Sequence, residues 1–181
     1  DIIDLATIEA GYLKLDVSQV NLHSMMDGVI ALLTERVKLQ EVQVHVDYER
    51  GADVMFADET RLKQLVFKLI SNAVKYTKSK GNIWVVWTKP QDDMIELIVR
   101  DDGIGIEPSK QAHVFDPFFR GMAAQGTSTG LGLSVVKRFV QLHGGSVSLH
   151  SMSGEGTTVT CSFPQQVLQA LAQTPKETAN A

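Results

Sequence analysis

The chain has 181 residues, of which 44% are hydrophobic and 21% are charged, as in a globular domain that buries a sizeable core. Its formal net charge of −4 provides no basic surface, so we expect no nucleic-acid partner. No apolar run could span a bilayer and no signal-peptide pattern opens the chain, which favours a cytoplasmic domain and leaves membrane anchoring of a full-length protein open. The single cysteine, Cys161, excludes an internal disulfide and is expected to be a buried thiol.

The first predicted elements are a helix end, a strand and a long helix. Residues 1–11 carry apolar side chains at helical spacing and end on a glycine, so we interpret them as the end of a longer helix. Apolar and polar residues alternate over 13–20, which predicts a strand. The period then becomes helical over 21–39, where Asn21 is placed to cap the helix.

The central part of the chain predicts three strands around a second long helix. Alternating valines indicate a strand over 42–46. After a loop, Asp58 is placed as the N-cap of a helix that is expected to run to about Tyr76. Segments rich in β-branched residues and tryptophan then predict strands over 82–88 and 94–101.

The last third begins with a loop and ends with a hairpin. The loop over 121–130 is rich in glycine and small polar residues and leads into a predicted helix over 131–142. A hairpin then pairs residues 146–151 with 157–163 across a turn that contains two glycines.

We expect one main domain with short additions at both ends. Residues 165–173 can form a short helix, and 174–181 are expected to be disordered. The chain is therefore divided into a helix end and linker at 1–11, a domain at 12–164, and a partly disordered tail at 165–181. The order of elements predicts an α+β fold, a two-layer sandwich of a mixed β-sheet with helices on one face.

The first motif with chemical meaning is the sequence Asp-Asp-Gly-Ile-Gly-Ile at 101–106, where a predicted strand ends. Gly103 and Gly105 would let the backbone approach a flat ligand closely, since no Cβ intervenes. Asp101 adds a fixed acceptor that could bind the exocyclic amine of adenine. A Gly-x-Gly pair alone is also common in turns that bind nothing.

The second motif is Thr-Gly-Leu-Gly-Leu-Ser at 129–134, at a junction of loop and helix. Helix N-termini present unpaired N–H groups and the positive end of a dipole, which favour phosphate. One such dipole contact contributes only ~0.3–1 kcal/mol, so several N–H groups and a metal would have to act together. A glycine-containing helix cap without a ligand is the alternative for this motif on its own.

The third motif lies on the predicted central helix, where Lys68, Asn72, Lys75 and Tyr76 follow one side at spacings of three and four. The amide of Asn72 can supply an oxygen ligand to a hard cation, and the ammonium of Lys75 can bind phosphate. A solvated polar face opposite the apolar stripe would produce the same spacing.

The fourth motif is the aromatic cluster Val-Phe-Asp-Pro-Phe-Phe-Arg at 114–120. Clusters of this kind usually pack in a core. Arg120, however, stands at the root of the glycine-rich loop, from which a guanidinium could reach a terminal phosphate.

Taken in order, these motifs closely resemble the boxes of the histidine kinase branch of the GHKL superfamily of ATPases, named for gyrase, Hsp90, histidine kinases and MutL. Residues 72–76 match the asparagine box, and residues 101–105 and 129–133 match the two glycine boxes. Residues 115–120 match the phenylalanine box, and residues 144–147 and 154–158 match the closing hairpin. Residues 4–11 resemble the end of the second dimerisation helix. The resemblance covers roughly residues 1–164 and implies the Bergerat (GHKL) ATP-binding fold.

The resemblance also implies a role for each matching residue. Asp101 would bind the adenine amine, supported through water by Thr157, and Asn72 would be the magnesium ligand. Lys75 and Arg120 would act on the phosphates as the catalytic residues. The implied binding residues for ATP–Mg²⁺ are Asn72, Lys75, Tyr76, Asp101, Gly103, Gly105, Ile106, Phe119, Arg120, Thr129, Gly130, Leu131, Gly132, Leu133 and Thr157.

One residue departs from the family pattern. Four positions before Asn72, histidine kinases usually carry a second asparagine and the hydrolysing members a general-base glutamate, whereas this chain has Lys68. The missing glutamate argues against an ATP-hydrolysing machine of the gyrase or MutL type. An ammonium ~4 Å from a divalent ion would be repelled by ~8 kcal/mol at an effective dielectric of about 20. Lys68 therefore either turns away on its long stem or partly replaces the metal against the phosphates.

The resemblance places the phosphorylated histidine outside this chain. No histidine is followed by the acidic residue and downstream proline of an acceptor box, so all five are interpreted as structural or surface residues: His23, His45, His113, His143 and His150. We therefore expect a monomer unable to phosphorylate itself. In the full-length protein we expect a homodimer whose histidine-bearing dimerisation domain and response regulator are its partners.

Two hypotheses follow. In the first, the chain is a catalytic domain that positions ATP–Mg²⁺ for phosphoryl transfer to a histidine elsewhere. In the second, it is a pseudokinase-like signalling module that binds nucleotide, or a protein partner, without competent transfer; Lys68 favours it, and the opening segment resembles unorthodox cell-cycle kinases of the DivL type. A dinucleotide-binding Rossmann enzyme is disfavoured, because no third glycine and no helix follow the Gly-x-Gly of residues 103–105.

Overall fold

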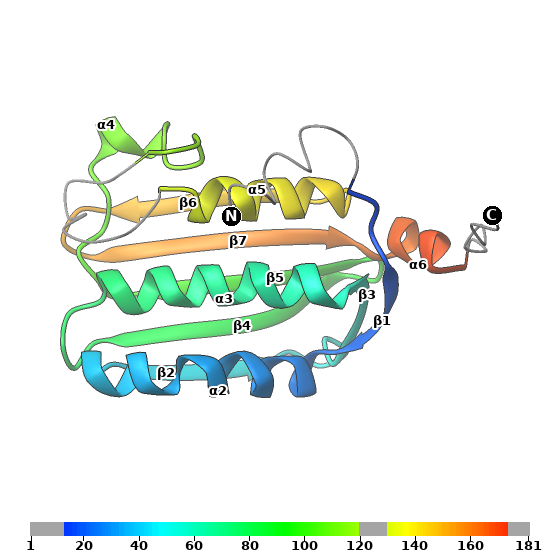
Figure 1. Cartoon of the computed structure of the whole chain (residues 1–181), viewed down its shortest axis with the longest axis horizontal. Coiled ribbons are helices and arrows are strands. Elements are labelled where there is room, and N and C mark those ends of the chain that lie inside the picture. Colours follow the sequence, from blue (N-terminus) through cyan, green and yellow to red (C-terminus); the bar gives the residue numbers. More distant parts are fainter. Residues whose placement is uncertain (1–12, 120–129, 174–181) are drawn as a thin grey trace, which may run out of the picture.

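The computed structural model describes residues 13–119 and 130–173. They form the predicted α+β sandwich, in which α2, α3 and α5 lie side by side on one face of a mixed sheet (Figure 1). The elements are β1 (Val17–Asn21), α2 (Leu22–Gln40), β2 (Gln43–Tyr48), β3 (Val54–Asp58), α3 (Glu59–Tyr76), β4 (Asn82–Gln91), β5 (Met94–Asp101), α4 (Pro108–Gln111), α5 (Gly132–Leu142), β6 (Ser146–Met152), β7 (Gly156–Pro164) and α6 (Gln165–Gln173). None of these helices is long and apolar enough to cross a membrane.

The main sheet has five strands in the order β2-β4-β5-β7-β6, with β2 parallel to β4 and the other pairs antiparallel. Alternate residues of each strand face the helices. On β4, Ile83, Val85 and Trp87 are fully buried there. Burial of such side chains contributes roughly 1.5–3 kcal/mol each, so this layer is the main source of stability.

Helix α3 is the central helix and connects the two ends of the sandwich. It packs against both α2 and α5. Its first turn is capped by Asp58, whose carboxylate accepts from the backbone N–H of Arg61 at 3.1 Å. At its other end, the carbonyl of Tyr76 accepts from the N–H of Ile104 at 3.2 Å, which joins the helix to the loop after β5.

Several predicted elements are confirmed with small shifts, including the caps Asn21 and Asp58. The strand predicted over 13–20 is wrong in its first half, because only Val17–Asn21 finds a partner strand. That partner, β3, was not predicted, since a run of only five residues after a loop gives little periodicity. Helix α4 was also not predicted, and β4 continues beyond the expected end at residue 88 through an irregular pairing.

Residues 165–173 form the predicted short helix, but this helix packs against the domain and is not part of a separate tail. Helix α6 packs on β1 and β3, and its Leu168 is fully buried. The Gln165 side chain accepts from the N–H of Phe56 at 2.7 Å. The predictions for residues 1–11, for 174–181 and for most of the 121–130 loop lie outside the described residues.

Two of the residues predicted to be structural are buried. Burial raises the pKa of the Cys161 thiol to about 12, so it stays protonated. His143 is 1% exposed between α5 and the start of α3. Its Nε2 accepts from the N–H of Asp58 at 3.1 Å, so Nδ1 carries the proton and donates to the carbonyl of Phe139 at 2.7 Å. Burial lowers the pKa of this imidazole from 6.5.

This lowered pKa predicts a pH-dependent stability. The unfolded chain protonates His143 near pH 6.5, whereas the folded state holds it neutral, so the stabilisation is complete above pH 6.5 and is lost as the pH falls toward the folded-state pKa. We expect the free energy of unfolding, from urea titrations between pH 5 and pH 8, to fall on the acid side. His143→Gln should flatten that slope, whereas His150→Gln, at an exposed histidine, should keep it. Equal slopes in the two variants would contradict the assignment.

Candidate functional site

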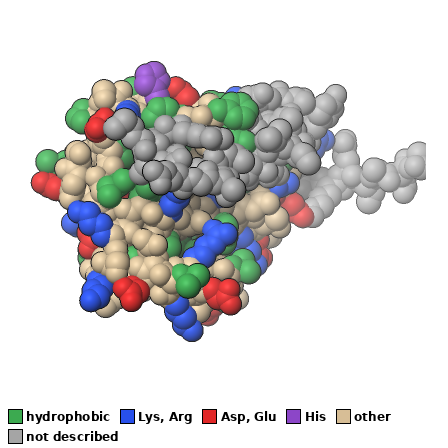
Figure 2. Space-filling view, turned by 60° about the vertical axis from the view of Figure 1, so that its left-hand side comes forward, with side chains coloured by type: hydrophobic (Ala, Val, Ile, Leu, Met, Phe, Trp, Pro, Cys, Tyr) green, Lys and Arg blue, Asp and Glu red, His purple; other side chains and the backbone are tan. Residues whose placement is uncertain are grey.

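A cavity of about 790 Å³ opens where α3 ends, between that helix, the loop after β5, the β6–β7 hairpin and the start of α5. Its size is within the range of small-molecule sites, roughly 300–1,000 Å³. Figure 2 views this end of the molecule, where lysine, arginine and acidic side chains are interspersed. The surface around the cavity therefore carries mixed charge.

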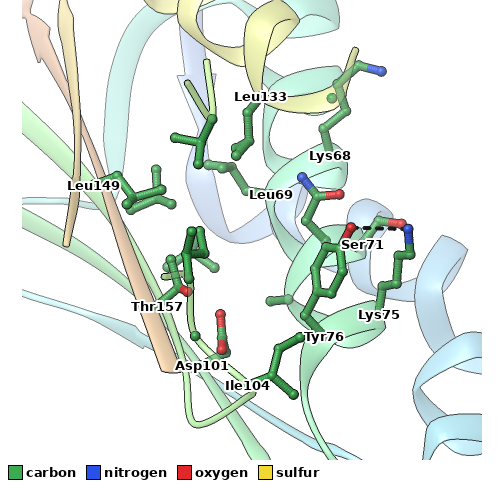
Figure 3. A pocket seen from close by; sticks show the side chains of 18 of the residues that line it. Lys68, Leu69, Ser71, Lys75, Tyr76, Asp101, Ile104, Leu133, Leu149 and Thr157 are labelled. Carbon is green, nitrogen blue, oxygen red and sulfur yellow. Dashed lines mark hydrogen bonds between the residues drawn. The ribbon is translucent and has the colours of Figure 1, made fainter. Parts of the chain in front are cut away.

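Asp101 stands at one end of the cavity. It is the last residue of β5 and only 8% exposed, and its side chain points into the cavity (Figure 3). Its carboxylate accepts from the N–H of Gly103 at 2.9 Å and also from the backbone of Thr157. Burial nevertheless raises its pKa, so a ligand group that donates to this carboxylate would replace lost hydration.

The two glycines after Asp101 are required by the packing of the protein itself. A Cβ at Gly103 would overlap the Tyr76 carbonyl, and a Cβ at Gly105, where φ is +65°, would overlap the Met152 carbonyl. Both glycines are therefore required by close contact with protein backbone on either side. The expectation that they also let a flat ligand approach closely stays a prediction, and Gly105 lines the cavity.

The same loop is held in place by residues that the sequence analysis did not select. The carboxylate of Asp102 accepts from Asn82 twice, from its N–H at 2.9 Å and its side-chain amide at 3.2 Å. The N–H of Ile106 donates to the hydroxyl of Ser151 at 2.8 Å, and the amide of Gln111 donates to the carbonyls of both Ile106 and Ser151. Of Asn82, Asp102, Gln111 and Ser151, Asp102 alone lies within one of the motifs, so it alone gave a signal in the sequence.

The predicted polar face of α3 forms a wall of the cavity. Asn72, Lys75, Tyr76 and the half-buried Lys68 all line it. Lys75 Nζ donates to the Tyr76 hydroxyl at 3.1 Å and lies 4.8 Å from the centroid of its ring. The amine of Lys68 points away from Asp101 and Tyr76 (Figure 3). The two orientations considered for Lys68 differ in its position relative to a bound metal and phosphates, so the choice between them stays a prediction.

The start of α5 lies against Asn72. A Cβ at Gly132 would lie 3.2 Å from the amide nitrogen of Asn72, so the first turn of α5 and the last turns of α3 are in contact. The N-cap residue of α5, Leu131, makes no side-chain capping bond. The Leu131 side chain therefore leaves the first N–H groups of this helix unbonded, as an anion site at a helix N-terminus requires.

Most of the predicted site residues are brought together. Those that line the cavity are Asn72, Lys75, Tyr76, Asp101, Gly105, Ile106, Phe119, Gly130, Gly132, Leu133 and Thr157. Gly103 and Leu131 do not line it, because both are buried behind its wall. Arg120 and Thr129 lie outside the described residues.

Residues 57–167 match the family model described as histidine kinase-, DNA gyrase B- and HSP90-like ATPase, and the chain belongs to this family of ATP-binding domains. The matching relatives are sensor histidine kinases, so the chain is an ATP-binding catalytic domain of that type. The circadian input-output histidine kinase CikA of Synechococcus elongatus is 38% identical over 93% of this chain and 23% of its own length. The sensor protein DivL of Caulobacter vibrioides is 31% identical over 91% of this chain and 21% of its own length. The chain thus spans less than a quarter of either relative.

Solved structures show the same fold. Full-length ShkA in complex with AMPPNP has a TM-score of 0.79 at 24% identity, with 90% of this chain and 34% of that one covered. Histidine kinase ThkA in complex with the response regulator protein TrrA has a TM-score of 0.72 at 21% identity, with 91% of this chain and 47% of that one covered.

Substitution of Asp101 should lower the affinity for nucleotide without lowering the stability of the fold. In Asp101→Asn, the amide would turn its oxygen to the N–H of Gly103 and its NH₂ toward the ligand, where an acceptor is needed. We expect the affinity for AMPPNP to fall roughly 10- to 150-fold, since a hydrogen bond to a charged group contributes about 1.5–3 kcal/mol. Calorimetric titration measures this, with Asp47→Asn at an exposed position as the control.

The stability of the same variant should not fall. Because the pKa of Asp101 is raised above 3.8 in the folded state, the ionised form at neutral pH costs stability that the amide does not. The free energy of unfolding of Asp101→Asn should equal or exceed that of the unmodified chain near pH 7.5. Undiminished AMPPNP affinity in this variant would exclude Asp101 from the binding site.

Proposed function

We propose that this chain is the part of a sensor histidine kinase that holds ATP–Mg²⁺ and presents its γ-phosphoryl group to a histidine outside the chain. The observation that carries the proposal is the set of polar groups that line one cavity. A buried acceptor, Asp101, lies on the sheet side of the cavity, and Asn72, Lys75 and the start of α5 line other parts of its wall. A nucleotide has the matching order of groups, a donating base edge and an anionic tail.

In this proposal the adenine amine donates to Asp101 and the base packs near Tyr76. The phosphates lie over the first turn of α5 and receive the ammonium of Lys75, which must then leave the Tyr76 hydroxyl. Catalysis consists of orientation and neutralisation of charge, since the transferred group needs little covalent help from the protein. By resemblance, Arg120 and Thr129 add contacts from the loop before α5.

Magnesium fits this arrangement through the nucleotide. Within residues 13–119 and 130–173, no cluster of three histidine, cysteine, aspartate or glutamate side chains could hold a metal. The amide oxygen of Asn72 is one hard ligand, and phosphate oxygens and waters would complete the set, which is how Mg²⁺ is usually bound beside phosphates. Bound there, the ion would neutralise charge on the phosphates.

The acceptor and the partners lie outside the cavity. No described residue that lines it is a histidine, and His143 is buried with both ring nitrogens bonded. We therefore propose a histidine-bearing dimerisation domain of the full-length homodimer as the phosphoryl acceptor. A response regulator would be the next partner, as in the ThkA–TrrA complex.

Calorimetric titration with AMPPNP, with and without Mg²⁺, tests this function. If the Lys68 side chain turns away from the bound metal, we expect Mg²⁺-dependent binding in the unmodified chain and a gain of at most a few fold in Lys68→Asn. Lys63→Asn, at a lysine of the same helix paired with Glu59, is the matched control. Binding that is metal-independent and becomes metal-dependent only in Lys68→Asn would favour the signalling module without competent transfer. No binding at all would overturn both nucleotide hypotheses.

A further inference from the structure

Arg36 lines the cavity although it belongs to α2, a helix that carries none of the motifs. Its side chain is exposed and reaches across to α3. There Nη1 donates to the hydroxyl of Ser71 at 2.9 Å, and the guanidinium carbon lies 5.7 Å from the centroid of the Phe67 ring. Both partners also line the cavity. Two contacts with the helix that forms the wall therefore hold the guanidinium at the edge of the cavity.

This guanidinium lies near the ammonium of Lys75. Ser71, which accepts from Arg36, stands four residues before Lys75 on α3. Side chains at this spacing are neighbours on one face of a helix, with Cβ atoms roughly 5–6 Å apart. Helical side chains also lean toward the N-terminus, so that of Lys75 leans toward the turn that carries Ser71. Figure 3 shows Ser71 and Lys75 on the same side of α3. Arg36 and Lys75 are thus neighbouring cations.

The acidic groups of the cavity wall do not neutralise these two cations. Asp101 and Glu107 line the cavity, but Asp101 lies on the sheet side and Glu107 pairs with Lys110 at 2.7 Å. Among the residues that the structure describes, no carboxylate forms an ion pair with Arg36 or Lys75. Neighbouring like charges repel each other, so an anion bound beside both would relieve that repulsion.

The guanidinium of Arg36 keeps most of its donors for such an anion. It has five N–H groups in one plane, and Ser71 accepts from one nitrogen. Phe67 contacts the guanidinium through its ring and accepts none of these protons in the plane. The remaining donors can form the paired hydrogen bonds with which arginine binds phosphate oxygens, whereas the ammonium of Lys75 acts as a point charge.

We propose that Arg36, positioned by Ser71, binds the terminal phosphoryl group of ATP and makes the site prefer ATP to ADP. The inference rests on the proposed nucleotide binding and deepens it with a residue outside the motifs. Asp101 lies on the sheet, Lys75 on α3 and Arg36 on α2. A nucleotide whose base lies at Asp101 and whose phosphates follow Lys75 reaches Arg36 with its last phosphoryl group. ADP lacks this group and leaves Arg36 on Ser71 alone.

The test compares AMPPNP, which has a third phosphoryl group, with ADP, which lacks it. Calorimetric titrations in the presence of Mg²⁺ give both dissociation constants for the unmodified chain and for Arg36→Gln. We expect the variant to bind AMPPNP roughly three- to tenfold more weakly and ADP within about twofold of the unmodified chain, as for an exposed charge pair strengthened by paired hydrogen bonds. Added salt should reduce the difference for AMPPNP, because exposed charges are screened.

Lys38→Gln is the matched control. It removes the same charge from an exposed position of the same helix, and Lys38 does not line the cavity. Its ratio of ADP to AMPPNP dissociation constants should equal that of the unmodified chain. A change in the ratio as large as in Arg36→Gln would show that the overall charge of α2 causes the preference, which would overturn the inference.

A second pair of variants tests the positioning by Ser71. Ser71→Ala should weaken AMPPNP binding by part of the effect of Arg36→Gln, because the guanidinium loses its acceptor. In the Arg36→Gln background the same substitution should have no further effect. Equal effects of Ser71→Ala in both backgrounds would mean that Ser71 does not act through Arg36.

Two results for Arg36→Gln itself would overturn the inference. They are an unchanged affinity for AMPPNP and an equal loss of affinity for AMPPNP and ADP, since the second would place Arg36 beside a group that both nucleotides carry. Absence of binding of either nucleotide to the unmodified chain would instead overturn the proposed function, and this inference with it.

Discussion

The candidate site is organised around one buried carboxylate. Asp101 is placed where β5 ends, with little access to water, and the burial of a charge is costly unless polar groups surround it. Backbone N–H groups from two segments supply part of that compensation. Only residues without a side chain allow the loop to fold back closely enough to do so, which is why Gly103 and Gly105 are needed. A carboxylate held in this way is partly desolvated before any ligand arrives, so a donor on the ligand gains more from it.

Helix α3 connects the loop after Asp101 with the part of the cavity beside α5. Its last carbonyl, at Tyr76, accepts from the loop that follows Asp101, while Asn72, in the last turns of the helix, touches the start of α5. The last turns of α3 thus connect the loop after Asp101 with the start of α5. Its other end is also anchored, because Asp58 caps it and His143 binds the Asp58 backbone. The buried imidazole therefore supports the site from the far side of the domain.

Motifs with their own local signal were predictable from the sequence. The long amphipathic helices, their caps at Asn21 and Asp58, and the gathering of Asn72 with Asp101 could be inferred from periodicity and from the resemblance. Pairing between segments that are distant in the sequence could not be predicted. Strand β3 is recognisable only through its partner β1, 33 or more residues earlier in the register, since five residues carry too little pattern. Ser151 and Asn82 act through hydrogen bonds to residues far along the chain, and a lone serine or asparagine in a strand gives no sign of them.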